Sequence, residues 1–107
     1  MDIRLKKQKD FDIVFNKGKR IYTQTHTLLF IENKEFKFGI SLSKKHGKAH
    51  QRNRIKRLIR ACVRQITKNE AKPFYIVVLP KVKNVYNYNE FYNDLSYSFK
   101  KGRIISD

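Results

Sequence analysis

Five cationic side chains are concentrated between residues 52 and 60, and no acidic side chain lies among them. An arginine guanidinium presents a flat fork of donors that matches phosphate oxygens, whereas a lysine ammonium acts as a point charge. On a helix, each exposed pair of like charges costs about 0.2–0.5 kcal/mol. Because the segment supplies no carboxylate to offset this repulsion, it predicts an external polyanion that contacts Arg52, Arg54, Lys56, Arg57 and Arg60.

The charge of the whole chain is unevenly distributed. The 107 residues carry a formal net charge of +16, from 25 Lys and Arg against 9 Asp and Glu. Residues 36–69 hold eleven Lys and Arg and no acid, and five of the eight arginines fall between 52 and 64. Such a basic region is typical of nucleic-acid binding, with an anionic membrane surface as the second candidate.

The chain lacks an evident catalytic constellation of its own. Two-metal hydrolysis of phosphodiesters needs clustered carboxylates, but the nine acids are scattered and avoid the basic region. His46 and His50 are spaced i, i+4, yet their cationic neighbours disfavour a bound metal. We therefore expect no catalytic and no metal-binding side chain. The alternative is a metal-free ribonuclease that uses His26, His46 or His50 with a lysine as general acid and base.

Hydrophobic periodicity predicts the elements that position the basic segment. The order is helix, strands, helix, strand, helix, which indicates a single α+β domain over residues 1–107. The helices are expected at 8–17, 50–68 and 89–101, and the strands at 20–32, with a break near Gln24, at 35–43 and at 74–79.

The helix expected at 50–68 has two distinct sides at about 100° per residue. The apolar side should dock on the sheet and consists of Ile55, Leu58, Ile59, Cys62 and Ile66. The opposite side carries Asn53, Arg57, Arg60, Arg64 and Lys68.

Two further patterns bear on the surface beside this helix. The strand expected at 35–43 alternates, which predicts a buried face and an open face that carries Lys37, Gly39, Ser41 and Ser43. Phe11 and Phe15 are an i, i+4 pair, and periodicity by itself favours packing of such a pair into the core.

Nothing in the sequence directs the chain to a membrane or out of the cell. The N-terminus lacks the apolar stretch of a signal peptide, and the apolar run around 74–79 is far too short for a bilayer span. The lone Cys62 fits a core thiol in a reducing compartment. We expect a cytoplasmic protein.

The segment FGISLSKKHGKAHQRNRIKRLIR, residues 38–60, resembles the signature of the bacterial ribonuclease P protein subunit. That pattern is a strand ending in Ser-x-Ser-Lys-Lys, then Gly-x-Ala, then Arg-Asn-Arg-x-Lys-Arg and a further Arg. The upstream DFDIVFNKGK resembles the family's Phe-x-x-x-Phe helix, which a glycine closes. The resemblance covers about residues 5–100. His46 and His50 stand where the family more often has aliphatic residues.

The resemblance implies a fold and a function. The fold is a two-layer αβββαβα sandwich with a left-handed βαβ crossover. The family's protein assists a catalytic RNA, and the ribonucleoprotein removes the 5′ leader of precursor tRNA by Mg²⁺-dependent hydrolysis. The RNA would carry the active site and the Mg²⁺, so the protein itself would need no cofactor. Its partners would be the ribonuclease P RNA and precursor tRNA, with no membrane and no obligate protein partner.

The resemblance also implies two groups of site residues. The residues expected to hold the leader, in a groove where bases stack without sequence preference, are Phe11, Phe15, Ser41, Ser43, Lys44, Arg52, Asn53 and Lys56. Those expected to face the backbone of the catalytic RNA are Lys45, Arg54, Arg57, Arg60 and Arg64. The alternative function is that of a structural RNA-binding protein of the ribosomal type or an RNA chaperone, which the basic helix and small α+β domain also permit.

Overall fold

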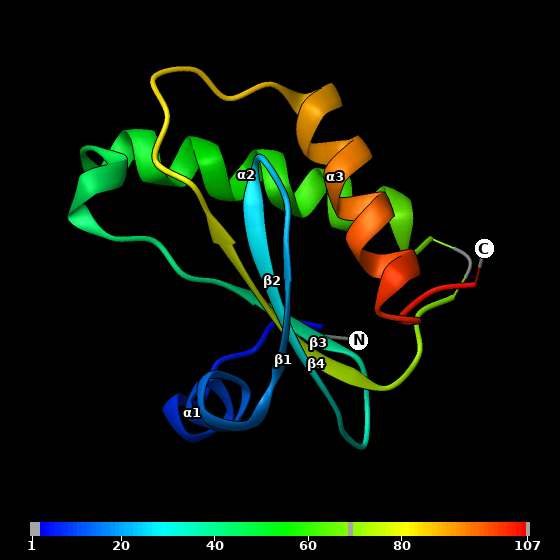
Figure 1. Cartoon of the computed structure of the whole chain (residues 1–107). Coiled ribbons are helices and arrows are strands. Elements are labelled where there is room, and N and C mark those ends of the chain that lie inside the picture. Colours follow the sequence, from blue (N-terminus) through cyan, green and yellow to red (C-terminus); the bar gives the residue numbers. More distant parts are fainter. Residues whose placement is uncertain (1–2, 69, 107) are drawn as a thin grey trace.

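A four-stranded sheet with three α-helices makes up the computed structural model, which describes residues 3–68 and 70–106 (Figure 1). The predicted mixed α+β fold and the order αβββαβα are confirmed. In chain order the elements are α1 (Gln8–Lys17), β1 (Lys19–Tyr22), β2 (His26–Glu32), β3 (Lys37–Ile40), the short 3₁₀ turn η1 (Lys44–His46), α2 (Ala49–Ile66), β4 (Phe74–Pro80) and α3 (Tyr88–Lys101).

The strands are arranged in the order β1-β2-β4-β3. β2 pairs antiparallel with both β1 and β4, whereas β3 runs parallel to β4 and is connected to it through α2. β3, α2 and β4 therefore form the βαβ unit of the expected topology. β4 lies inside the sheet, and four consecutive residues, 75–78, are buried, as expected for a strand that is covered on both faces.

Helices cover the two faces unequally. α2 and α3 pack on one face, over the larger core that includes Leu28, Ile59 and Phe91. α1 packs on the other face, over a smaller cluster that includes Val14 and Val77. Figure 1 shows α2 and α3 on one side of the strands and α1 on the other. β1 and β3 are the outermost of the four strands, and the surfaces described below lie beside them.

The break between β1 and β2 is stabilised by a buried histidine. His26 is fully buried; its Nδ1 lies 2.9 Å from the hydroxyl of Thr25 and 3.1 Å from that of Thr23, and its Nε2 lies 3.2 Å from the hydroxyl of Ser98 on α3. Burial lowers the pKa of His26 to about 4. The nearby carboxylate of Asp94 partly opposes this shift, because it favours the protonated imidazole. His26 therefore joins β2 to α3 and is inaccessible to a substrate.

The strand expected at 35–43 is shorter than predicted, and its polar face is not open along its whole length. β3 ends at Ile40, and Gly39 is buried. A Cβ at Gly39 would lie 2.6 Å from the ring of Phe11, so α1 occupies the space above this residue. Alternation could not reveal this, because it does not show which face a distant helix will cover.

No helix in the described part of the chain is long and apolar enough to cross a membrane. Cys62 is buried and free, as expected of a core thiol, and burial raises its pKa to about 11.

Candidate nucleic-acid interface

α2 is anchored to the sheet by the side that the sequence predicted. Ile55, Ile59, Cys62 and Val63 are buried in the core, and Leu58 and Ile66 pack against its rim. The turn before the helix is closed by the guanidinium of Arg52, which donates to the carbonyl of Gly47 at 2.8 Å. Gly47 adopts a φ of 107°, a backbone conformation that residues with a Cβ rarely adopt.

The opposite side of α2 presents cations to solvent. Arg54, Arg57 and Arg64 are exposed and Arg60 is half-buried. Within residues 3–68 and 70–106, none of these four guanidinium groups forms an ion pair or a hydrogen bond with another part of the chain. The repulsion among them is thus not offset by carboxylates of the described chain.

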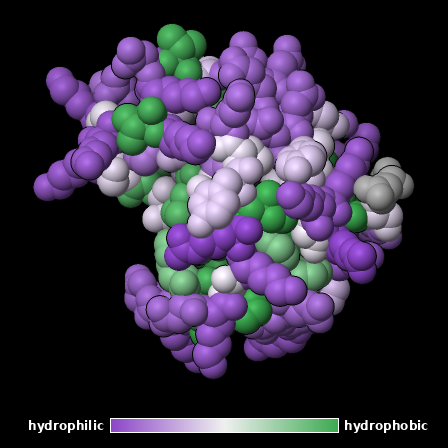
Figure 2. All heavy atoms as spheres, in the orientation of Figure 1, coloured by the Kyte–Doolittle hydropathy of each residue, from purple (hydrophilic) through white to green (hydrophobic). Residues whose placement is uncertain are grey.

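A groove runs between α1 and the start of α2, at the β3 edge of the sheet. Its volume is about 300 Å³, and it is lined by Gln8, Phe11, Phe15, Ile40, Ser41, Leu42, Arg52 and Lys56. A second hollow of about 210 Å³ adjoins it and shares Phe11, Ile40 and Lys56, with Arg60 on its rim. In Figure 2 the outline of the molecule is notched between the α1 layer and the α2 layer, with hydrophobic side chains in the recess and hydrophilic ones above and below it.

The structure brings together five of the residues expected to hold the leader. Phe11 and Phe15 come from α1, Ser41 follows β3, and Arg52 and Lys56 come from the N-terminal half of α2. Both phenylalanines are half-buried and pack against the cluster under α1. They therefore support the core with one side and wall the groove with the other, so the two interpretations of this pair are compatible.

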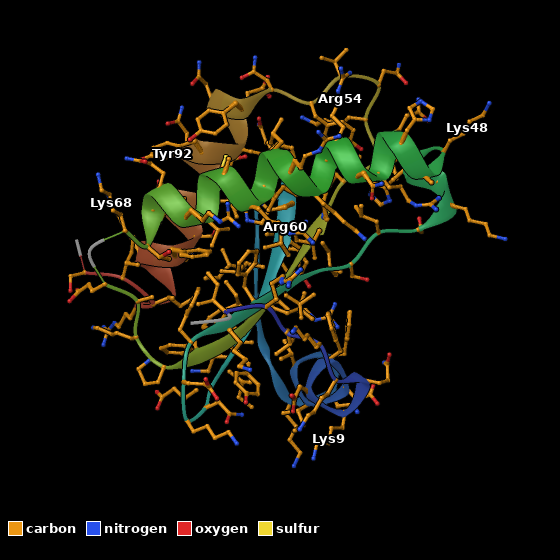
Figure 3. The ribbon with its side chains drawn as sticks, turned by 180° about the vertical axis from the view of Figure 1, so that it is seen from behind. Lys9, Lys48, Arg54, Arg60, Lys68 and Tyr92 are labelled. Carbon is orange, nitrogen blue, oxygen red and sulfur yellow. The ribbon has the colours of Figure 1, made fainter. Side chains whose placement is uncertain are left out.

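The two long sides of α2 face different hollows. Lys56 and Arg60, one turn apart, point toward the groove. Arg54 and Arg57 line a separate hollow of about 570 Å³, formed with His50 and with Val85 and Tyr86 of the loop before α3. Figure 3 shows Arg54 and Arg60 leaving opposite sides of the helix.

Arg60 lies on a different side of α2 from two of the cations with which it was grouped. Arg60 was expected with Arg54 and Arg57, but it lies beside Lys56 and Phe11. The helical wheel placed Arg60 opposite the core, yet it could not show that α1 and β3 approach α2 from that side.

Other expected residues lie outside the groove. Lys44 and Lys45 are exposed on η1, and Asn53 is exposed on α2. Ser43 caps η1, since its hydroxyl accepts from the backbone N–H of Lys45 at 3.3 Å. Arg64 lies one turn beyond Arg60, on the exposed side of α2.

His46 has a structural role in the same turn. Its Nδ1 accepts from the backbone N–H of Ser43 at 3.1 Å, and its Nε2 donates to the carbonyl of Pro80 at 2.7 Å. His46 thus ties η1 to the end of β4. His46 and His50 both line the hollow beside the 81–87 loop, but His26 is fully buried elsewhere, so the structure does not bring all three histidines into one site. Among the described residues, no group of three His, Cys, Asp or Glu side chains could hold a metal ion.

The N-terminal segment was missed by the sequence analysis. Leu5 donates its N–H to the carbonyl of Phe38, and Phe38 donates to the carbonyl of Ile3, both at 2.8 Å, so this segment extends the sheet beside β3. It brings Arg4 to the hollow that adjoins the groove. The alternation of Ile3 and Leu5 with charged residues was the available signal, but the segment is too short for periodicity to decide.

Comparisons with known proteins agree on one family. A family profile described as Ribonuclease P matches residues 1–103. The ribonuclease P protein component of an Exiguobacterium species is 30% identical over 105 residues, covering 96% of this chain and 92% of that protein. The fold matches the RNase P protein of Staphylococcus aureus with a TM-score of 0.84 at 28% identity, covering 99% and 100% of the two chains. It also matches that of Thermotoga maritima with a TM-score of 0.82 at 29% identity, covering 97% and 98%.

Proposed function

The chain belongs to the ribonuclease P protein family, and from this premise we propose how it serves tRNA processing. As a component of an endoribonuclease complex, it binds both the catalytic RNA and the 5′ leader of precursor tRNA. The RNA carries out the Mg²⁺-dependent cleavage, in the cytoplasm. The observation that carries this proposal is the groove at the β3 edge, which combines two aromatic rings with two cations.

The groove has the chemistry that a single-stranded leader requires. Every base has a π face, so Phe11 and Phe15 can stack on a leader of any sequence, at about 1–3 kcal/mol per base. Arg52 and Lys56 stand on the α2 side of the same groove and neutralise backbone phosphates. Arg60 extends this row of cations toward the N-terminal segment, and we assign it to the leader.

The other side of α2 is proposed to contact the catalytic RNA. Arg54 and Arg57 line the hollow beside the 81–87 loop, and Arg64 is exposed about two turns beyond Arg57 on α2. Lys45 is exposed at the same end of α2 and belongs to this group. A folded RNA on one side of the helix and the leader on the other would place the cleavage site near the start of α2.

The protein's own side chains are not proposed as catalysts. The described residues offer no cluster of donors suited to Mg²⁺, and the basic surroundings of the groove repel a dication. Neutralising phosphates on two RNAs brings them together, and this lowers the Mg²⁺ concentration that the complex needs.

Reconstitution tests the proposal. The protein is mixed with a bacterial ribonuclease P RNA at low Mg²⁺, and cleavage of precursor tRNA is followed. We expect the protein to accelerate cleavage at the mature 5′ end, and the RNA alone to regain the rate at high Mg²⁺. Absence of stimulation, together with strand annealing of unrelated RNAs, would instead support an RNA chaperone.

A further inference from the structure

A second basic hollow lies at the β1 edge of the sheet, opposite the edge that forms the groove. Its volume is about 670 Å³, and it is built from the end of α1, from β1, from the C-terminal end of β2, from the start of β4 and from the end of α3. Figure 1 shows the C-terminal end of α3 beside the segment that enters β4. Five cations line it, against one acid, Glu32; they are Lys17, Lys19, Arg20, Lys101 and Arg103.

The floor of this hollow is aromatic. Phe30 on β2 is directly opposite Lys19 on β1, and cross-strand partners project from the same face of a sheet. The ring of Phe30 lies 6.1 Å from that of Phe74, and a Cβ at Gly102 would come within 3.3 Å of it. Lys19 and the end of α3 therefore flank the same ring.

The end of α3 holds one of these cations in an unfavourable backbone conformation. The N–H of Ile104 donates to the carbonyl of Phe99, and that of Arg103 donates to the carbonyl of Lys100, which together form a Schellman motif. This motif needs a left-handed residue, usually glycine, and here Arg103 takes that position with a φ of 61°. Gly102 stands one residue earlier, where its missing Cβ lets α3 approach Phe30.

The cations of this hollow are not neutralised by the described chain. None of the five forms an ion pair with a carboxylate of residues 3–68 or 70–106. Lys101 instead lies over the ring of Tyr97, at 5.6 Å from its centroid. Lysines on an edge strand hinder pairing with another sheet, and cations at a helix C-terminus complement its dipole. Those local effects account for single residues, not for the convergence of five cations from three elements on one hollow.

We propose that the hollow at the β1 edge is a second binding site for RNA backbone, occupied by the catalytic RNA while the leader lies at the β3 edge. This inference rests on the proposed function. The groove and the hollow are separated by the whole sheet, in a molecule that measures only 34 × 30 × 26 Å. A large folded RNA can contact the exposed side of α2 and the β1 edge at once, whereas a leader that is held in the groove is directed along the other edge.

The test compares two double variants with equal net charge. Lys19→Ala with Arg103→Gly removes two cations from the hollow. Lys9→Ala with Lys34→Ala removes two exposed cations from α1 and from the turn before β3, and is the matched control. Binding to the catalytic RNA without substrate is measured across a range of salt. We expect the first variant to reduce the slope of log affinity against log salt by about two, with weaker affinity at every salt concentration. The preference for precursor over mature tRNA should be unchanged.

Arg103→Gly as a single variant separates binding from folding. Replacing a left-handed arginine by glycine relieves backbone strain, so its melting temperature should be equal to or higher than that of the wild-type protein. We expect it to bind the catalytic RNA more weakly although it is no less stable.

The outcomes are distinct. If the hollow variant binds like the control variant, the second site is wrong, and the proposed function stands as long as the wild-type protein stimulates cleavage. If the hollow variant loses only its preference for precursor tRNA, the site serves the substrate and the proposal is again wrong. If the wild-type protein neither binds nor stimulates the catalytic RNA, both proposals are overturned.

Discussion

At the scale of single residues, one side chain often meets two demands in this small domain. Phe11 covers Gly39 and also walls the groove, and Arg52 closes the turn at Gly47 while lining the same groove. A domain of 107 residues buries a limited share of its surface, so few side chains can be devoted to binding alone. Substitutions in the groove therefore need controls that report on stability.

Phe15→Ala should weaken binding of precursor tRNA by about 5- to 150-fold, because one stacking surface worth about 1–3 kcal/mol per base is lost. Binding of mature tRNA, which lacks the leader, should change much less. The measurement is the ratio of the two affinities in the reconstituted complex.

Val14→Ala is the matched control for this substitution. Val14 is the fully buried neighbour of Phe15 on α1 and does not line the groove. The substitution Val14→Ala should lower the free energy of unfolding without changing the ratio of the affinities for precursor and mature tRNA. Equal ratios for both variants would show that Phe15 serves only the core.

At the scale of elements, α2 separates two groups of cations. Helical geometry places Lys56 and Arg60 one turn apart on the groove side, and Arg54 and Arg57 on the side of the 81–87 loop. The buried side of the same helix fixes both groups relative to the sheet. The helix is thus a rigid spacer whose two sides are predicted to contact different RNAs.

Two double variants of equal charge test this separation. Arg54→Ala with Arg57→Ala should weaken binding to the catalytic RNA and reduce its salt slope by about two, because two phosphate contacts are lost. Lys56→Ala with Arg60→Ala should mainly lower the preference for precursor over mature tRNA.

For each double variant, two quantities are measured. The first is the affinity of the protein for the catalytic RNA without substrate, and the second is the affinity of the reconstituted complex for precursor and for mature tRNA. In the described residues none of these four side chains donates a hydrogen bond to the chain, so folding should be little affected. Two variants with the same profile would argue against a two-sided helix.

At the scale of the whole molecule, the net charge of +16 opposes the compact state, and the buried His26 adds a pH dependence to stability. The pKa of His26 falls from 6.5 to about 4 on folding, so the unfolded chain binds more protons between these values. Stability is therefore fully present above pH 6.5 and is lost as pH falls toward 4.

Unfolding by urea should report this loss. Between pH 7.5 and pH 5.0 the free energy of unfolding should fall by about 2 kcal/mol from His26 alone. His26→Gln, where it folds, should show a smaller loss. His50→Gln, at an exposed position on α2, should retain the wild-type loss. An equal pH dependence in both variants would exclude His26 as the cause.

The sequence by itself located the helices and β4 and indicated the class of partner. Period-3.6 and period-2 patterns located the helices and β4 to within about two residues, because those segments bury one face or both faces in the core. The acid-free run 36–69 indicated a polyanion, because charge is a property of composition and needs no coordinates. The signature at 38–60 gave the family.

Only the tertiary structure decided which residues share a surface. It placed Gly39 under Phe11, moved Arg60 to the groove side, and brought Arg4 beside β3. It also buried His26, and it gathered Lys19 and Arg103, 84 positions apart, around Phe30. The physical reason is that local periodicity reports how each element meets the core, whereas the surfaces between elements depend on contacts between residues that are far apart in sequence.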